Sequence, residues 1–286
     1  MKHVLVTGGT GFLGGHVVSR LRAEGHHVVV HGRTRKGEGD AAIGDLADPS
    51  VADRVLAAHT WDAIINLAGP VTSGNEELAT GIDVVAAHAR IALQVRRHAR
   101  SARIVHASSM TVYGMPQQAE VREDAPRKPQ HLYALGKVIA EDILLEPSLD
   151  TWILRLPGLF SEQRTTGALY HFCRAANAGE TVRVTTAVPT PWNILHVEDA
   201  AEAIVRAVTS SERAAGAVNV SYGEPVELVA IAERIAALAG KGSRVEHPGV
   251  HHPRLLLVAD RMRSLLRWSP PSLDDRLARL VAAHAS

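Results

Sequence analysis

Short apolar runs alternate with longer amphipathic stretches along the first half of the chain. The runs are residues 3–7, 27–31, 62–68, 103–108 and 151–157. Strands that are apolar on both faces are typical of a parallel sheet that helices cover on both sides. Helical patterns separate the runs at 12–24, 76–98 and 133–146. The pattern therefore predicts an α/β fold in which a doubly wound parallel sheet has right-handed crossovers.

The regular alternation of strand and helix patterns stops after residue 157. Residues 158–192 are less regular and include a Pro-rich piece, and a strand, helix and strand pattern then resumes between 194 and 223. We expect residues 1–157, completed by about 194–224, to form one domain. We expect 158–193 and 225–286 to form a smaller C-terminal lobe over the carboxyl edge of the sheet, where such folds bind their ligands.

The composition narrows the range of partners. The 286 residues carry 31 Lys and Arg against 30 Asp and Glu, a net charge of +1, and this balance favours neither nucleic acid nor an anionic membrane as a partner. The first apolar run is too short for a signal peptide, and no run reaches the length of a membrane span. We therefore expect a soluble cytoplasmic protein.

The cysteine and histidine residues predict neither a disulfide nor a metal site. The single cysteine, Cys173, excludes an internal disulfide, and we interpret it as a small buried hydrophobe. The sixteen histidines are scattered, and the two His-His pairs, at 26–27 and 251–252, lack nearby carboxylate or cysteine partners, so we expect no metal site.

A glycine-rich turn follows the first strand and opens the first helix. Gly8 permits a tight turn, Gly11 lets the backbone approach a phosphate, and Gly14 lets the helix pack closely on the strand. A dinucleotide pyrophosphate can then rest on the helix N-terminus. The simpler alternative is an ordinary strand-to-helix turn. The context predicts that residues 1–157 are a dinucleotide-binding domain of the Rossmann type.

The spacing of these glycines, in "TGGTGFLG", and several later motifs resemble one known family. The later motifs are "GDL" (44–46), "NLAG" (66–69), "SSMTVYG" (108–114), "YALGK" (133–137), "LRLPGLF" (154–160), "ILHVEDAAEAI" (194–204) and "VADRMRSLLRWSP" (258–270). The chain resembles the extended short-chain dehydrogenase/reductase superfamily of NAD(P)-dependent epimerases, dehydratases and ketoreductases. Within it the chain is most similar to ketoreductases of nucleotide-linked 4-keto-sugars.

The resemblance implies a set of cofactor contacts and an assembly. A homodimer formed by the helices at 76–98 and 133–146 is implied, and the smaller lobe is expected to bind the substrate. The implied cofactor contacts are Gly8, Gly11, Phe12, Leu13, Gly14, Asp45, Leu46, Leu67, Ala68, Gly69, Tyr133, Lys137 and Pro157.

The residues after the second strand favour NADP(H) over NAD(H). An NAD enzyme places an acidic side chain there for the ribose 2′-hydroxyl, whereas this chain has Gly32 followed by Arg33, Arg35 and Lys36. A guanidinium beside a bare glycine can accept a 2′-phosphate. The alternative is a basic loop that only faces solvent.

Tyr133 and Lys137 lie four residues apart in a helical pattern and therefore project to the same face. A nearby ammonium lowers the pKa of a tyrosine, and in the reductive direction Tyr133 would give its proton to a carbonyl oxygen. The resemblance assigns Lys137 a second role on the nicotinamide ribose, and assigns Ser109, rather than Ser108, a hydrogen bond to the reacting oxygen. An ordinary helix face is the alternative.

Departures from the family pattern narrow the reaction. Met110 and Thr111 stand where family dehydratases carry an Asp-Glu pair, and neither can shuttle a proton, so dehydration is not expected. Asp83 stands in place of a family Asn. Trp192 replaces an arginine that clamps a nucleotide-sugar diphosphate. The candidate substrate contacts are Met110, Thr111, Trp192, Arg183 and Arg254.

The sequence thus predicts an NADP(H)-dependent ketoreductase that acts on a nucleotide-linked keto-sugar, with Ser109, Tyr133 and Lys137 as catalytic residues. The first alternative is a nucleotide-sugar epimerase that keeps its cofactor bound. A reductase of a non-sugar ketone is the second, because Trp192 can stack on an aromatic substrate. A non-catalytic NADP-sensing module is the third, although such a module has no need of the three catalytic residues.

Overall fold

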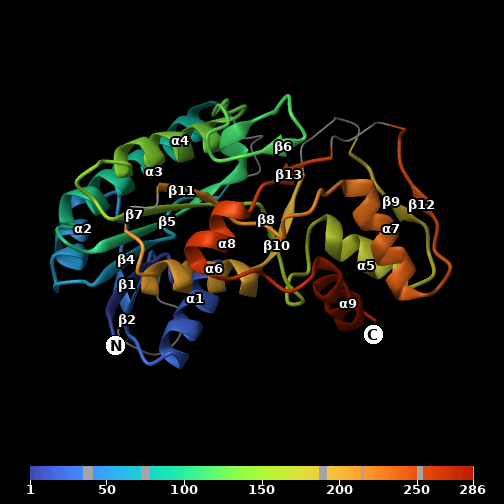
Figure 1. Cartoon of the computed structure of the whole chain (residues 1–286), viewed down its shortest axis with the longest axis horizontal. Coiled ribbons are helices and arrows are strands. Elements are labelled where there is room, and N and C mark those ends of the chain that lie inside the picture. Colours follow the sequence, from blue (N-terminus) through green and yellow to red (C-terminus); the bar gives the residue numbers. More distant parts are fainter. Residues whose placement is uncertain (35–40, 72–77, 187–191, 214–215, 250–253, 286) are drawn as a thin grey trace.

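Seven parallel strands form the central sheet of the protein (Figure 1). The computed structural model describes residues 1–34, 41–71, 78–186, 192–213, 216–249 and 254–285. The strand order is β11-β7-β5-β4-β1-β2-β3. The strands are β1 (His3–Thr7), β2 (His27–Gly32), β3 (Ala41–Ile43), β4 (Ala63–Asn66), β5 (Arg103–Ser109), β7 (Thr151–Leu156) and β11 (Gly216–Asn219). The expected doubly wound α/β fold is confirmed.

Helices cover both faces of this sheet because successive strand residues point to opposite sides. On β5, Ile104 packs into one core and Val105 into the other. The first core lies under α2 (Pro49–Leu56), α3 (Leu78–His98) and α4 (Leu132–Leu144). The second core lies under α1 (Phe12–Ala23), α6 (Val197–Thr209) and α8 (Asp260–Leu266). Figure 1 shows these two groups of helices on opposite faces of the sheet.

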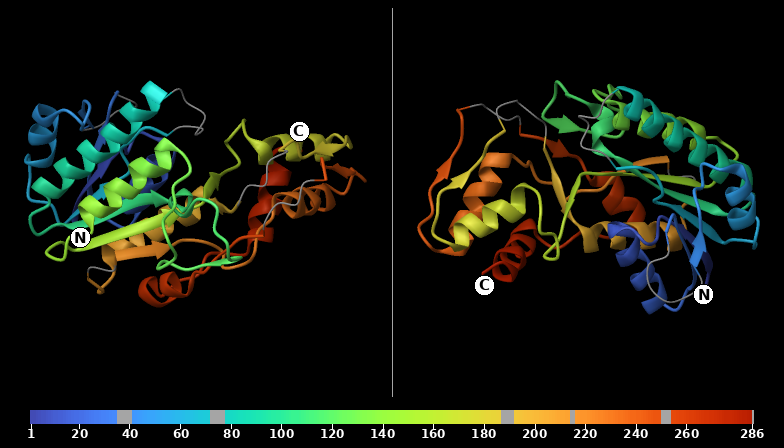
Figure 2. Two further views of the ribbon diagram at one scale, coloured as in Figure 1. Left: turned by 90° about the horizontal axis from the view of Figure 1, so that it is seen from above. Right: turned by 180° about the vertical axis from the view of Figure 1, so that it is seen from behind.

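A smaller lobe with its own core stands beside the sheet, as the two views of Figure 2 show. Its core includes Phe172 and the fully buried Cys173, whose thiol pKa burial raises to about 12. The lobe comprises β8 (Gly158–Phe160), α5 (Ala168–Asn177), β9 (Val182–Arg183), β10 (Ile194–His196), α7 (Leu228–Ala239), β12 (Val245–Glu246) and α9 (Leu273–Ala283). Strand β10 pairs with β8 instead of joining the central sheet.

The structure differs from the sequence-based expectation in three places. Strand β4 ends at Asn66, because the chain turns away through Gly69 at φ 146°. Residues 158–192 contain the ten-residue helix α5, which buries residues at helical spacing from Leu169 to Ala176. Helix α8 falls in the part expected to belong to the lobe, but its Met262 packs in the core of the sheet. The short strand β3 and helix α2 are additional to the predicted elements.

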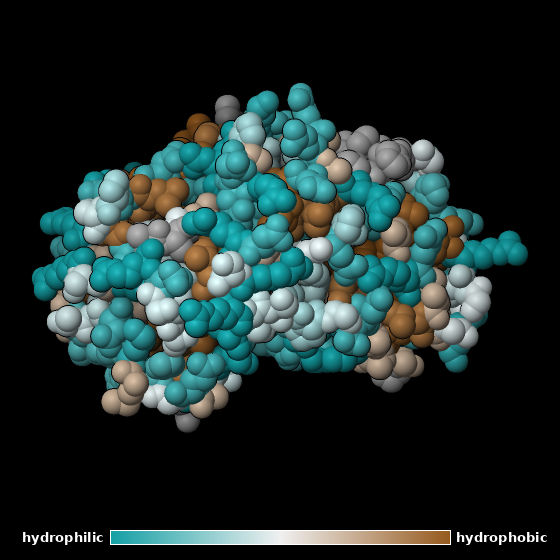
Figure 3. Space-filling view, viewed as in Figure 1, coloured by the Kyte–Doolittle hydropathy of each residue, from teal (hydrophilic) through white to brown (hydrophobic). Residues whose placement is uncertain are grey.

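Among the described residues, no helix is long and apolar enough to cross a bilayer. On the face drawn in Figure 3, polar side chains dominate and apolar ones form small separate groups.

A buried ion pair fixes α4 on the sheet. Glu141 of α4 is fully buried, and both of its carboxylate oxygens accept hydrogen bonds from Arg155 of β7, at 3.0 Å from Nε and 2.7 Å from Nη2. Arg155 Nη1 also donates to the Tyr113 hydroxyl at 2.8 Å. Tyr113 lies in the 3₁₀ helix Met110–Tyr113, next to the pair of short strands β6 (Glu120–Val121) and β13 (Leu256–Leu257). The Glu141–Arg155 ion pair therefore holds α4, β7 and the end of β5 together.

We expect Glu141→Ala to destabilise the protein strongly, because it leaves the Arg155 guanidinium buried without its partner. Breaking a buried pair in this way costs about 3 to 5 kcal/mol of unfolding free energy. Glu146→Ala is the control, since it breaks the exposed Arg96–Glu146 pair, and such pairs contribute about 0 to 1 kcal/mol. Urea unfolding measures both. Equal losses for the two variants would show that the buried pair has no special part in the fold.

Candidate active site

A deep cleft lies at the carboxyl edge of the sheet, between the strand ends and the lobe. Its volume is about 1310 Å³, above the range of roughly 300 to 1,000 Å³ that a single small ligand fills. The sheet side contributes the glycine turn, the ends of β2, β4 and β5, and part of α4. The lobe side contributes residues 158–159, 163–166 and 192–193. The cleft is therefore large enough for a dinucleotide and a second molecule together.

The glycine turn is shaped for a phosphate. Gly8 has φ 69°, and a Cβ on it would lie 2.8 Å from the backbone of Leu67. A Cβ on Gly14 would lie 2.6 Å from the Cα of Gly9, so α1 approaches β1 as closely as the sequence predicts. Gly11 is the N-cap of α1 and provides no side-chain cap. The first N–H groups of α1 therefore face the cleft and can bind an anion.

Residues at the ends of β2 and β3 line the part of the cleft where the sequence places the adenosine. Gly32, Arg33 and Asp45 all line the cleft. A Cβ on Gly32 would lie 2.7 Å from Cγ2 of Thr10, so Thr10 already occupies the space of an acidic side chain at this position. Arg33 is exposed here, whereas Arg35 lies outside the described residues.

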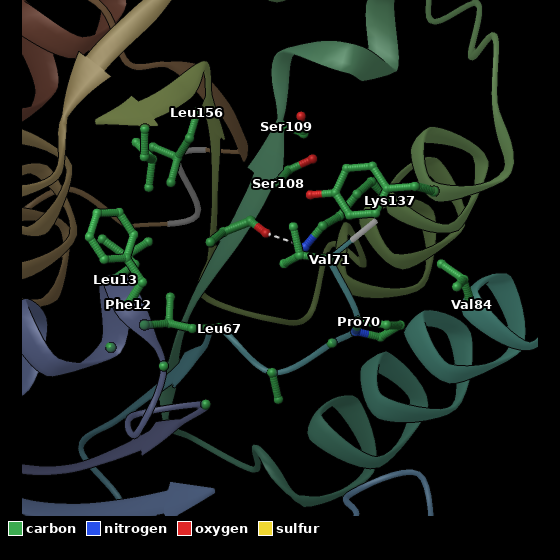
Figure 4. Close-up of a pocket in the computed structure, with 18 of the residues that line it drawn as sticks. Phe12, Leu13, Leu67, Pro70, Val71, Val84, Ser108, Ser109, Lys137 and Leu156 are labelled. Carbon is green, nitrogen blue, oxygen red and sulfur yellow. Dashed lines mark hydrogen bonds between the residues drawn. The ribbon is translucent and has the colours of Figure 1, made fainter. Parts of the chain in front are cut away.

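The expected catalytic residues lie close together where β5 ends and α4 begins (Figure 4). Lys137 is only 6% exposed, and its Nζ donates a hydrogen bond of 2.8 Å to the carbonyl oxygen of Ala107. The Nζ atom lies 5.8 Å from the centroid of the Tyr133 ring, and the Ser109 hydroxyl is a hydrogen-bond partner of Tyr133. Tyr133 and Lys137 therefore share one site, as the helical spacing predicts, and Ser109, which the family resemblance implies, lies there too.

The pKa of Tyr133 differs from the expectation, and the pKa of Lys137 is also shifted. Burial raises the pKa of Tyr133 above its ordinary value, and the hydrogen bond with Ser109 offsets this only in part. Burial lowers the pKa of Lys137 to about 8, and Glu141 opposes that shift. The predicted lowering of the tyrosine pKa by Lys137 is not found, because the ammonium is directed at Ala107 and is itself poorly solvated.

The two neighbouring serines have different partners. Ser108 donates to the carboxylate of Glu141 and so belongs to the buried network. Ser109 Oγ accepts hydrogen bonds from the backbone N–H of Thr111 at 3.2 Å and from its hydroxyl at 2.9 Å. The proton of Ser109 therefore remains available to Tyr133 or to a ligand. Met110 and Thr111 also line the cleft.

The lobe side confirms one of the three more distant substrate candidates as a cleft residue. Trp192 is half-buried and lines the cleft. Arg183 lies on β9 with its Nε 3.4 Å from Glu246, and neither it nor the exposed Arg254 is part of the cleft lining. Arg183 lies away from the site because β9 pairs with β12 in the lobe, and Arg254 lies outside the cleft lining in the segment before β13.

Arg164 and His88 are among the residues in or near the cleft that the sequence does not predict. Arg164 reaches the cleft from the segment after β8, with its guanidinium 5.8 Å from the ring centroid of Phe12 and Nη1 donating to Leu159 O. His88 of α3 lies behind Tyr133, with the two ring centroids 5.6 Å apart. Neither stands in a recognisable motif, and Arg164 lies in the segment without clear periodicity. Within the described part of the chain, no cluster of His, Cys, Asp or Glu is arranged to hold a metal ion.

Sequence comparisons connect this site with known enzymes. The model of the NAD dependent epimerase/dehydratase family matches residues 4–221. The chain is 28% identical over 320 residues to a UDP-glucose 4-epimerase from Azospirillum brasilense, covering 99% of this chain and 91% of that protein. It is 25% identical to a probable UDP-arabinose 4-epimerase from Oryza sativa subsp. japonica, covering 96% of this chain and 77% of that protein.

Solved structures share the fold at lower identity. The Bordetella bronchiseptica enzyme WbmG in complex with NAD has a TM-score of 0.83 at 18% identity, covering 99% of this chain and 93% of that one. A UDP-glucose 4-epimerase from Thermus thermophilus in complex with NAD has a TM-score of 0.80 at 22% identity, covering 99% and 98%. Such likeness establishes the common fold.

We expect Lys137→Met to stabilise the protein at neutral pH, which is the opposite of most core substitutions. A fall of the Lys137 pKa from 10.5 to about 8 corresponds to roughly 3 kcal/mol of destabilisation. This cost is fully present below pH 8 and fades as the pH rises toward 10.5. Urea unfolding at pH 7 and pH 10 measures it. The exposed Lys241→Met is the control, and a less stable Lys137→Met protein at pH 7 would contradict the account.

Proposed function

The chain belongs to the NAD dependent epimerase/dehydratase family, and from that premise we propose that it is a nucleotide-sugar 4-epimerase. In such a reaction, C4 of the sugar is oxidised from an alcohol to a ketone and is then reduced on the opposite face. The relatives named above are 4-epimerases of UDP-sugars, which supports this alternative over the ketoreductase that the sequence reasoning put first.

The residues present fit a nicotinamide dinucleotide. Its pyrophosphate would lie on the N–H groups of α1, where side chains on Gly8 or Gly14 would meet backbone. The segment Leu67–Gly69 and Pro157 line the adjoining part of the cleft and would hold its nicotinamide half. When bound in its oxidised form, the dinucleotide supplies a positive charge and a reversible acceptor for hydride.

Tyr133 is the residue that we propose moves the proton. As a phenolate, the form that the positive charge of a bound oxidised dinucleotide would favour, it takes the proton of the sugar hydroxyl during oxidation and returns it to the carbonyl oxygen during reduction, so no net proton is gained or lost. Ser109 holds the same oxygen, because its own proton is not committed to Thr111. Lys137 supplies positive charge on the same helix face, and its pKa of about 8 means that this charge is lost as the pH rises above 8.

The neighbours of Ser109 support epimerisation over dehydration. Loss of water needs an additional acid and base beside the reacting carbon. Met110 and Thr111, which line the cleft there, cannot transfer protons at neutral pH. Positions 110 and 111 therefore add no acid or base to Tyr133, and Tyr133 is sufficient for oxidation and reduction at a single carbon.

The lobe wall supports a nucleotide as part of the substrate. The face of Trp192 suits an aromatic base or a sugar ring. Arg164 presents a guanidinium to the same cleft, a group that pairs well with a diphosphate. A UDP-sugar carries all three of these parts, as do the substrates named for the relatives.

One observation favours a second candidate, an NADP(H)-dependent ketoreductase. No acidic side chain stands at Gly32, Thr10 fills the space that one would need, and Arg33 lines the cleft beside it. A 2′-phosphate would meet a guanidinium here. A reductase consumes NADPH from solution, whereas an epimerase recycles one bound dinucleotide, so the two candidates differ in cofactor retention.

The division of the chain and its location are also proposals. We assign the dinucleotide to residues 1–157 and about 194–224, apart from β10, which pairs with β8 of the lobe. We assign the nucleotide sugar to 158–193 and 225–286, apart from α8, whose Met262 belongs to the core of the sheet. The single cysteine suits the reducing conditions of the cytoplasm.

We further propose a homodimer through α3 and α4, as the family resemblance implies. Ile82 and Leu93 of α3 are 55% and 49% exposed, and Leu135 of α4 is 37% exposed. Leu93→Glu should convert the dimer to a monomer in light scattering, because it buries a charge in the interface. The control is Leu238→Glu, at a residue of α7 that is 43% exposed. A monomeric wild-type protein would remove this proposal.

The purified protein should retain NAD through dialysis and interconvert UDP-glucose and UDP-galactose, or another pair of UDP-sugar 4-epimers, with no cofactor added. Tyr133→Phe removes the transferable proton and should lower the turnover rate at least about hundredfold. Nucleotide extraction and a coupled product assay measure both. Activity of the Tyr133→Phe variant close to that of the wild type would refute the role of Tyr133. A protein free of nucleotide that prefers NADPH about tenfold or more would favour the reductase.

A further inference from the structure

His88 of α3 lies behind the proposed catalytic residues and contacts both Tyr133 and the segment after β4. It is 2% exposed. Its Nε2 lies 3.1 Å from the carbonyl oxygen of Pro70, in the segment after β4 that includes the dinucleotide contacts. Its ring lies edge-on to Tyr133, with an angle of 70° between the planes and 5.6 Å between the centroids. One side chain therefore joins the dinucleotide wall to the tyrosine.

Two glycines make the space for this imidazole. A Cβ on Gly69 would lie 2.5 Å from Cε1 of His88. A Cβ on Gly136, within the Tyr133–Lys137 stretch of α4, would lie 3.0 Å from Cδ2 of the same ring. Any larger residue at either position forces the ring to shift. The ring is thus wedged between the turn after β4 and the catalytic helix.

The hydrogen bond shows which ring nitrogen of His88 carries a hydrogen. A carbonyl oxygen can only accept, so Nε2 carries the hydrogen and donates to Pro70. Burial and the nearby Lys137 ammonium lower the pKa of His88 to about 3. The imidazole therefore stays neutral at any working pH and adds no positive charge next to Lys137.

We infer that His88 is a positioning residue, which holds the Pro70 carbonyl and the Tyr133 ring in a fixed relation so that the tyrosine meets a sugar bound against the dinucleotide. The inference rests on the proposed function, since it assumes that Tyr133 transfers the proton. A displacement of about 1 Å at a reacting group can slow a reaction by about a hundredfold. A residue that fixes this distance therefore acts on turnover more than on binding.

A pair of amide variants tests the inference. The amide nitrogen of Gln reaches the position of Nε2 and can still donate to Pro70, whereas that of Asn is one methylene too short. We expect His88→Gln to keep the turnover rate within about threefold and His88→Asn to lose at least about tenfold. The KM for the sugar nucleotide and the dissociation constant for NAD should change by less than about threefold in both. His98→Asn, on the same helix, is the control, because His98 bonds Gln94 and Asp53 away from the site.

The outcomes separate this inference from the proposed function. Equal turnover of the Gln and Asn variants, or a loss in both KM and NAD affinity that matches the loss in turnover, overturns the positioning role. If the Asn variant does not fold, His88→Leu replaces it, since leucine keeps most of the volume and removes the donor. Tyr133→Phe with full activity overturns the proposed function instead, whatever the His88 variants do.

Discussion

The bidentate ion pair between Glu141 and Arg155 is the interaction on which the site depends. It joins α4 to β7 inside the protein, with Glu141 fully buried. Lys137 lies one helical turn before Glu141, and Tyr133 one turn before Lys137, so the pair sets the height of both residues above the sheet. Ser108 donates to the same carboxylate, which orients the end of β5 and leaves the next residue, Ser109, facing the cleft.

Close backbone approaches complete this arrangement. Gly8 and Gly14 let α1 meet the sheet edge, and Gly69 and Gly136 leave room for the His88 ring. The packing places poorly solvated groups together: burial lowers the pKa of Lys137 and raises that of Tyr133. At neutral pH the Lys137 shift costs folding free energy, whereas the Tyr133 shift does not, because the phenol is neutral there in the folded and the unfolded chain alike. Shifted pKa values of this kind are typical of sites where protons move. The positive charge of a bound oxidised dinucleotide would favour ionised Tyr133.

The sequence predicts the parts that depend on local pattern. Apolar runs locate the main strands. The glycine spacing, together with Tyr133 and Lys137, predicts the sheet side of the cleft. The partners of side chains over long sequence distances are not visible in such patterns. Arg183 and Arg254 are cations in the expected lobe, yet neither lines the cleft, and the pairing of β9 with β12 holds Arg183 away from it. Arg164 reaches the cleft from an irregular segment. The same limit applies to the pKa of Tyr133, because helical spacing does not reveal that Lys137 donates to Ala107.

The central claim is that hydride leaves and returns to the same sugar carbon within one closed cycle. The most direct measurement uses a UDP-sugar that carries deuterium at C4 and follows the label by NMR and mass spectrometry while the 4-epimer forms. The account predicts that the deuterium is retained at C4 in the product, with no net oxidation or reduction of the nicotinamide. Deuterium that appears in free nicotinamide dinucleotide, or a product that is a ketone formed in proportion to cofactor consumed, would contradict it.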